Sequence, residues 1–444
     1  MRTSVATLRA QWSLLPSAWR RAAVGISLLW MATALGAVLT FLVQVVLARR
    51  LGPHEFGRFT VALATVAMVA PVAGFGLPQL WLRLYGVEGW QAGRWMLPSL
   101  RFVAWTMAFG CAAAIAWSVF AASGGSTSLT CLLLPVIPCT LVVGLVSSKL
   151  RLEEDDRGLA MWQLALPGSR FAFALAVLAW PVVGAATAAA GFGLVGAAVA
   201  VAGIPALVAM WRGDFALRGH APRDDRLHAP GNESMAAVWR LGWAYGLAAL
   251  LYPIFFQVGT VMLGRMEGPR EAGLFGIGLG VMTAVYLLPA TVYQKYLGSR
   301  LHRWSVHEPQ KFRRVHRHGA WIMLLAGLVC GALVAAVAPV FVRAAFGTAF
   351  AGATAVLVVL SACAPLRFLS IAIASALLDE RQARLRVLTM GGSVAAVILF
   401  NLVLIPRYHA LGTAFATVGG EAVMLASSWL AVRYAVPVLA GRDA

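Results

Sequence analysis

The chain has 444 residues, of which 60% are hydrophobic and only 12% carry a charge. This composition excludes a soluble globular protein, which needs more charged surface around its core. The apolar residues occur in runs of about 20, the length of a helix that crosses the hydrocarbon core of a bilayer. Runs of this length also exclude an outer-membrane barrel, whose strands are short and alternate. The sequence therefore predicts an all-α polytopic membrane protein.

We expect about 12 transmembrane helices in two six-helix halves. The predicted spans are residues 24–48, 59–81, 102–122, 129–148, 159–182, 190–211, 241–263, 273–294, 319–342, 353–377, 387–405 and 411–432. The predicted domains are a cytoplasmic basic N-terminal segment (1–23), an N-terminal six-helix bundle (24–211), a cytoplasmic linker (212–240), a C-terminal six-helix bundle (241–432) and a cytoplasmic tail (433–444).

A short motif occurs twice in the chain. Gly52-Pro53, Glu55, Gly57 and Phe59 reappear 216 positions later as Gly268-Pro269, Glu271, Gly273 and Phe275. Gly196, Ala198 and Ala200 recur at the same offset, and Pro138, Ser148, Leu150 and Glu153 recur at an offset of 227. Six predicted spans separate the two copies of the first motif, so both copies face the same side of the membrane. This indicates parallel repeats related by an axis along the membrane normal.

Lys and Arg are unevenly distributed between the loops. With the N-terminus inside, 27 of the 36 lie in cytoplasmic segments and seven in the opposite loops. The positive-inside rule therefore places both termini in the cytoplasm. The net charge of +19 is explained by this loop charge, and no nucleic-acid partner is expected.

Several classes of chemistry have no support in the sequence. No phosphate-binding loop of the G-x-x-x-x-G-K-[S/T] type occurs, and no long extracytoplasmic loop carries paired carboxylates or histidines. The five cysteines lie inside apolar segments without paired spacing. Glu271 belongs to the repeat and is expected to cap or orient the following helix. We expect no catalytic residue, no metal site and no cofactor, and therefore no enzyme.

Three charged residues fall inside predicted spans, where a charge is costly to bury: Arg170, Arg367 and Glu421. In one interpretation Glu421 pairs with one arginine and fixes helices together. In the other, one or both arginines line a water-filled cavity and bind an anionic group such as a diphosphate. Arg83 and Lys295, at cytoplasmic helix ends, are candidates for the mouth of such a cavity, or else anchors that reach the membrane interface.

The run from Leu47 to Gly57, LARRLGPHEFG, and the run from Ala73 to Pro78, AGFGLP, resemble the opening of Wzx-type polysaccharide flippases. These belong to the superfamily that also contains lipid II flippases and MATE drug exporters. In the C-terminal half, Phe346-Gly347, the run 401–406 and the run 412–417 agree with this resemblance. His409-Ala410-Leu411 departs from it, because the family usually has a glycine-rich turn there.

The resemblance implies two six-helix bundles in a MATE-like V shape around a central cationic cavity. It also implies alternating access that moves a polyprenyl-diphosphate-linked oligosaccharide across the bacterial inner membrane, for O-antigen, capsule or exopolysaccharide synthesis. The expected partners are this lipid-linked substrate, membrane lipids and a polysaccharide polymerase or export machinery. The alternatives are a MATE-like exporter of small cations or drugs, and a membrane enzyme acting on lipid-linked sugars.

Overall fold

The computed structural model describes residues 17–121, 126–180, 183–221, 233–290, 308–377 and 380–435, and all regular structure in these ranges is helical. The α-helices of the N-terminal half are α2 (Ser17–Val69), α3 (Leu77–Glu88), α4 (Met96–Ala121), α5 (Ser126–Leu133), α6 (Val136–Leu152), α7 (Asp156–Leu178) and α8 (Ala185–Arg212). Those of the C-terminal half are α9 (Met235–Met266), α10 (Pro269–Ala290), α12 (Pro309–Phe346), α13 (Ala353–Ser361), α14 (Cys363–Ala374) and α15 (Glu380–Ala435). Short 3-10 helices cover Ala70–Val72, Gly89–Trp95 and Thr348–Phe350.

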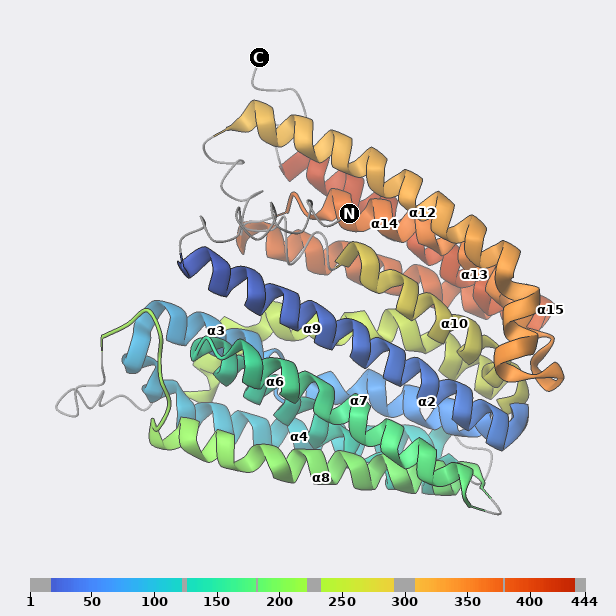
Figure 1. Cartoon of the computed structure of the whole chain (residues 1–444), viewed down its shortest axis with the longest axis horizontal. Coiled ribbons are helices and arrows are strands. Elements are labelled where there is room, and N and C mark those ends of the chain that lie inside the picture. Colours follow the sequence, from blue (N-terminus) through green and yellow to red (C-terminus); the bar gives the residue numbers. More distant parts are fainter. Residues whose placement is uncertain are drawn as a thin grey trace, which may run out of the picture.

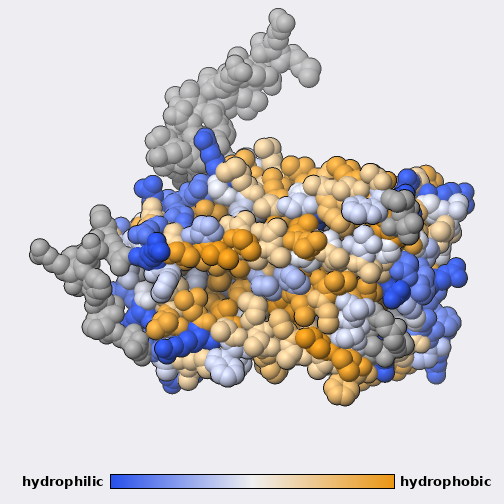
Figure 2. Space-filling view, turned by 90° about the horizontal axis from the view of Figure 1, so that it is seen from below, coloured by the Kyte–Doolittle hydropathy of each residue, from blue (hydrophilic) through white to orange (hydrophobic). Residues whose placement is uncertain are grey.

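The helices run roughly along one direction, as Figure 1 shows, with those of the N-terminal half in its lower part and α12 to α15 in its upper part. Hydrophobic side chains form a broad belt across the middle of the molecule, and hydrophilic side chains gather at both ends of the long axis (Figure 2). A belt of this kind is the surface that a bilayer covers. The protein is therefore a multi-pass membrane protein.

The number of passes agrees with the prediction of about twelve. α2 bends at Gly52, which has a φ of 72°, and α15 bends at His409, which has a φ of 50°, so each contains two passes. α5 with α6, and α13 with α14, each form one interrupted pass. Counted in this way, the described ranges contain twelve passes, six in each half.

The second pass is less regular than the sequence suggested. A continuous span was expected over 59–81, but α2 ends at Val69 and α3 begins only at Leu77. Between them, Gly74, Phe75 and Gly76 all have positive φ angles of 77°, 34° and 78°. Residues in a right-handed α-helix have negative φ angles, so this segment is not helical. Positive φ angles are accessible to glycine and costly for phenylalanine.

The two copies of the repeated motif pack directly against each other. A Cβ at Gly57 would lie 1.7 Å from the carbonyl oxygen of Pro269, and a Cβ at Gly273 would lie 2.5 Å from that of Pro53. The contact is reciprocal, since Gly57 corresponds to Gly273 and Pro53 to Pro269. Only glycine allows the backbones of α2 and α10 to approach this closely. We call this contact the glycine seam, and the end of the molecule where it lies the Gly-Pro end.

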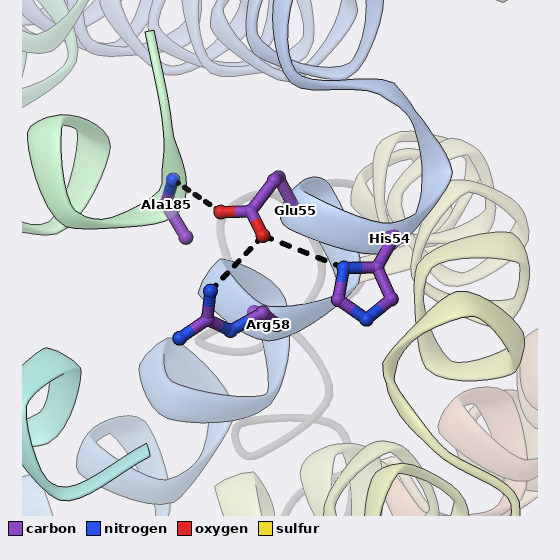
Figure 3. A network of polar contacts seen from close by, with 4 residues as sticks. All are labelled: His54, Glu55, Arg58 and Ala185. Atoms are coloured by element: carbon purple, nitrogen blue, oxygen red, sulfur yellow. Dashed lines mark hydrogen bonds and ion pairs between the residues drawn. The ribbon is translucent and has the colours of Figure 1, made fainter. Parts of the chain in front are cut away.

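The glutamates of the repeat cap helices at the same end. Figure 3 shows Glu55 accepting a hydrogen bond from the backbone N–H of Ala185, the first residue of α8, at 2.9 Å. Arg58 donates to the same carboxylate at 3.0 Å. In the C-terminal half, Glu271 accepts from the N–H of Ala410, the first residue after the bend in α15, at 3.3 Å. The expected cap is thus present, but Glu271 caps a distant helix and not the one that follows it.

Glu55 lies in the turn that joins the first two passes. The hydrogen bond from Ala185, together with Arg58, lowers the pKa of Glu55 and outweighs the opposing effect of partial burial. A carboxylate whose pKa is lowered by folding stabilises the fold above the ordinary carboxylate range, and this contribution is lost as the pH falls through the lowered pKa.

Glu55→Gln should therefore lower the thermal stability of the purified protein in detergent at pH 7, by about 0.3–1 kcal/mol for a charge at a helix N-terminus. The wild type and the variant should converge at low pH, once the pH has fallen through the lowered pKa of Glu55, because the carboxyl of the wild type is then as neutral as the glutamine of the variant. Glu154→Gln, in the exposed turn before α7, is the control and should melt like the wild type at both pH values. A difference that persists at low pH would contradict the charged cap.

The glycine seam predicts a second effect. Gly57→Ala and Gly273→Ala each insert a methyl group against a backbone carbonyl and should destabilise the protein by about 1–3 kcal/mol, as overpacking does. Gly86→Ala is the matched control, because a Cβ at this helical glycine has no neighbour within 4 Å. Melting curves of the three variants would decide the matter, and equal stability of all three would contradict the close approach.

Candidate functional site

A buried ion pair lies inside the C-terminal half. α14 carries Arg367 and the second part of α15 carries Glu421, and Nη1 of the arginine lies 3.4 Å from Oε1 of the glutamate. The side chain of Arg367 is 10% exposed and that of Glu421 is fully buried. Two opposite charges at this depth stabilise each other, since either one alone would remain uncompensated in a low-dielectric interior. Two of the three charges that the sequence marked as costly, Arg367 and Glu421, are therefore brought together in this half.

Aromatic rings surround the guanidinium group of Arg367. Its Cζ lies 4.8 Å from the ring centre of Phe256, 5.6 Å from that of Tyr252 and 5.8 Å from that of Tyr286. A cation over a ring face is attracted by the quadrupole of the ring, and more strongly where water is excluded. We call these three residues of α9 and α10 the ring cage. Tyr252 is its outermost member, since its side chain is half-exposed whereas Tyr286 is buried.

The ion pair is incomplete. An arginine and a carboxylate commonly form two parallel hydrogen bonds, but here a single long contact is present. In the described part of the chain, neither Nε of Arg367 nor Oε2 of Glu421 has a hydrogen-bond partner, although both atoms are buried. Unsatisfied buried polar atoms are rare in folded proteins, and each is costly. The pair therefore retains one donor and one acceptor that can take another ligand.

Arg170 occupies a comparable place in the N-terminal half. It lies in α7 after Pro167-Gly168, and its Cζ is 4.6 Å from the ring centre of Phe192 in α8. Phe192 in turn makes an edge-to-face contact with Phe59 of the repeated motif. Nε of Arg170 is buried and has no hydrogen-bond partner among the described residues. In each half, an arginine from the middle of a membrane pass thus lies against at least one aromatic ring of the same half.

The other predicted site residues are not placed in these two clusters. Arg83 is exposed on α3, and Lys295 lies outside the described residues. The ring cage and Phe192 were not predicted from the sequence. The spacing of Tyr252 and Phe256, four residues apart on one helix, places them on one face, but this spacing alone does not distinguish an arginine cage from ordinary core packing.

The two halves also meet at the end opposite the Gly-Pro end. The ring of Phe75, in the break between α2 and α3, stacks on Trp239 of α9 with centroids 4.9 Å apart and planes 9° apart. Gly246 of α9 leaves room for this ring, since a Cβ there would lie 2.1 Å from it. The halves are therefore in contact at both ends.

This architecture defines a two-lobed helical membrane protein with a cation inside each lobe. A family model described as "Polysaccharide biosynthesis protein" matches residues 22–294, well over half of the chain. The chain belongs to this family of polysaccharide biosynthesis proteins. A comparison with curated proteins finds no significant match.

Solved structures share the fold at low sequence identity. "Lipid II flippase MurJ, inward closed conformation" is 11% identical with a TM-score of 0.70, covering 91% of this chain and 87% of that chain. An inward-facing multidrug resistance MATE family transporter of the MOP superfamily is 14% identical with a TM-score of 0.70, covering 92% of this chain and 96% of that chain. A MOP superfamily transporter from Pyrococcus furiosus, described by a reverse polarity of its binding pocket, is 14% identical with a TM-score of 0.53, and the match covers 95% of both chains.

These comparisons confirm the predicted fold class and the resemblance to the superfamily of flippases and MATE transporters. The similar structures are described as a lipid II flippase and as a MATE family transporter, in keeping with the expectation that the protein is not an enzyme.

Proposed function

We propose that this protein is a flippase that moves a polyprenyl-diphosphate-linked oligosaccharide across the bacterial inner membrane by alternating access. The observation that carries the proposal is that two arginines, Arg170 and Arg367, each have a buried Nε without a hydrogen-bond partner among the described residues, in a chain of the polysaccharide biosynthesis family. A diphosphate is the one group of such a substrate that needs cations in a low-dielectric site, and guanidinium groups bind phosphate with fork-like geometry.

The balance of charge in the two clusters supports an anionic substrate. The two clusters together contain two arginines and one glutamate, so their combined charge is positive. A carrier of small cations needs membrane-embedded carboxylates, and Glu421 is already engaged by Arg367. The Pyrococcus furiosus transporter is described as having a pocket of reverse polarity and, on that ground, a different function. A cationic interior is a comparable departure from what a cation exporter needs.

The surroundings of the substrate follow from the same proposal. The diphosphate would be held by the arginines, the sugars would pass between the halves, and the prenyl tail would stay in lipid. Both termini would lie in the cytoplasm, as the loop charges predict. The product would serve O-antigen, capsule or exopolysaccharide synthesis, and a polysaccharide polymerase or export complex would take it up.

A MATE-like exporter of small cations or drugs is the second candidate. The similarity to a MATE family transporter at a TM-score of 0.70 favours it, and Glu421 is the one intramembrane carboxylate that could serve it. Drug resistance that depends on this protein and is lost in Glu421→Gln would support the exporter.

A deletion strain tests the proposal. Loss of the flippase should abolish the surface polysaccharide and cause lipid-linked repeat units to accumulate on the cytoplasmic side, because assembly stops before translocation. Mass spectrometry of the lipid-linked pool would identify the glycan. Unchanged surface polymer without accumulation, in a strain with no second flippase, would overturn the proposal.

Complementation of the same strain tests the arginines. Arg367→Ala and Arg170→Ala should each fail to restore surface polymer, and Arg170→Ala should do so although the protein is present at normal abundance. Arg367→Ala also leaves Glu421 unpaired, a loss of about 3–5 kcal/mol for a broken buried pair. The double variant Arg367→Gln with Glu421→Gln removes both charges together and should likewise fail.

Arg101→Ala, on the exposed face of α4, is the control and should restore export. Full export by the double variant would exclude Arg367 from substrate binding.

A further inference from the structure

We propose that Arg367 has two positions: it rests on Glu421 when the site is empty, and it leaves Glu421 for the anionic group of the substrate during transport. In this view Glu421 is a positioning residue that competes with the substrate for one guanidinium group. The inference rests on the proposed function, because it takes a diphosphate as the competing ligand.

The geometry of the ion pair indicates that a stronger ligand can displace Glu421 from Arg367. A pair that served only to fix α14 against α15 would be expected to form both hydrogen bonds that an arginine and a carboxylate can share. Arg367 and Glu421 form one, at the long distance of 3.4 Å, and each retains a buried atom without a partner. A loose pair is weaker than a bidentate one, so a diphosphate with more oxygen acceptors can displace the carboxylate.

Arg367 and Glu421 differ in how freely their side chains can move. Glu421 follows Gly419 and Gly420, where a Cβ would lie 2.8 Å from the ring of Phe400 and 2.1 Å from Val397. The second part of α15 is therefore packed tightly against its first part, and the carboxylate is held in place. Arg367 reaches Glu421 through a long side chain that can change rotamer without moving α14. The arginine is the partner that moves.

The ring cage provides a path along which the guanidinium group of Arg367 can move. The guanidinium group lies near three ring faces, and the outermost ring, Tyr252, has a half-exposed side chain. A cation that shifts toward Tyr252 exchanges one ring face for another, so the attraction is retained along the way. Tyr252 therefore marks the side of the cage on which an incoming anion meets Arg367.

The exchange also explains how the substrate would leave. A buried arginine without a counter-ion would hold a diphosphate strongly and release it slowly. Glu421 supplies a fixed counter-charge that recaptures the arginine, so binding and release are balanced. A transporter needs this balance, because a site must bind its substrate well enough to take it up and weakly enough to let it leave.

Binding of farnesyl diphosphate to the purified full-length protein in detergent, measured by calorimetry, tests the inference. Glu421→Gln removes the competitor and should tighten binding at least tenfold. Glu421→Asp keeps the charge but shortens the side chain, so it stretches the pair and should tighten binding less. Arg367→Gln with Glu421→Gln should lose the tightening. Ser428→Ala, a buried residue two turns further along the same helix, is the control and should bind like the wild type.

A second readout covers the case in which Glu421→Gln folds poorly. Its unpaired Arg367 should make the variant less stable without ligand, and farnesyl diphosphate should raise its melting temperature more than that of the wild type. In export assays the variant should bind substrate but turn over more slowly than the wild type.

Unchanged or weaker binding by both folded Glu421 variants would overturn the inference. If the deletion strain still lost its polymer, the proposed function would stand and the ion pair would be structural. If the strain kept its polymer, and neither the wild type nor Glu421→Gln bound farnesyl diphosphate, both the inference and the proposed function would fail.

Discussion

The glycine seam is the contact on which the arrangement of the two halves depends. Gly57 meets the carbonyl of Pro269 and Gly273 meets the carbonyl of Pro53, so two backbones touch without intervening side chains. Reciprocal contact between equivalent residues is the hallmark of a two-fold interface. The same short turns also provide the caps: Glu55 holds the start of α8, and Glu271 holds the second part of α15. One repeated motif thus sets the distance between the halves and fixes one helix within each of them.

The interior charges obey a different constraint, the cost of a charge in a low-dielectric medium. The C-terminal half meets it with a counter-ion and the ring cage, whereas Arg170 in the N-terminal half relies on the face of Phe192. Both solutions leave Nε of the arginine without a hydrogen-bond partner among the described residues. The scaffold therefore keeps two cations that it does not fully satisfy, which is the condition for binding an anion.

The sequence predicted the fold well because membrane insertion imposes simple rules. Apolar runs of helical length determined the number of passes, and the spacing of the Gly-Pro motifs determined that the repeats are parallel. The interruptions were missed: the break at Gly74 to Gly76 lies inside an apolar run, so hydropathy alone does not detect it. The arrangement of the charges inside the membrane was predicted in part. Burial cost singled out Arg170, Arg367 and Glu421, but the choice of partner depends on distances between segments far apart in the chain, which no local pattern contains.

The comparison of the two halves separates scaffold from function. The glycines of close backbone contact and the glutamates that cap helices occur in both copies of the repeated motif, because the helices of both halves pack in the same way. The ion pair is not duplicated: at the offsets that relate the repeats, Arg367 corresponds to Thr140 and Glu421 to Pro205. A charge that served only to hold a six-helix half together would be useful in both halves, since their helices are arranged alike. Because the ion pair occurs in one half alone, fold symmetry does not require it. The ion pair is therefore better explained by a task that the protein performs once per cycle, at one site, than by the architecture that the repeats share.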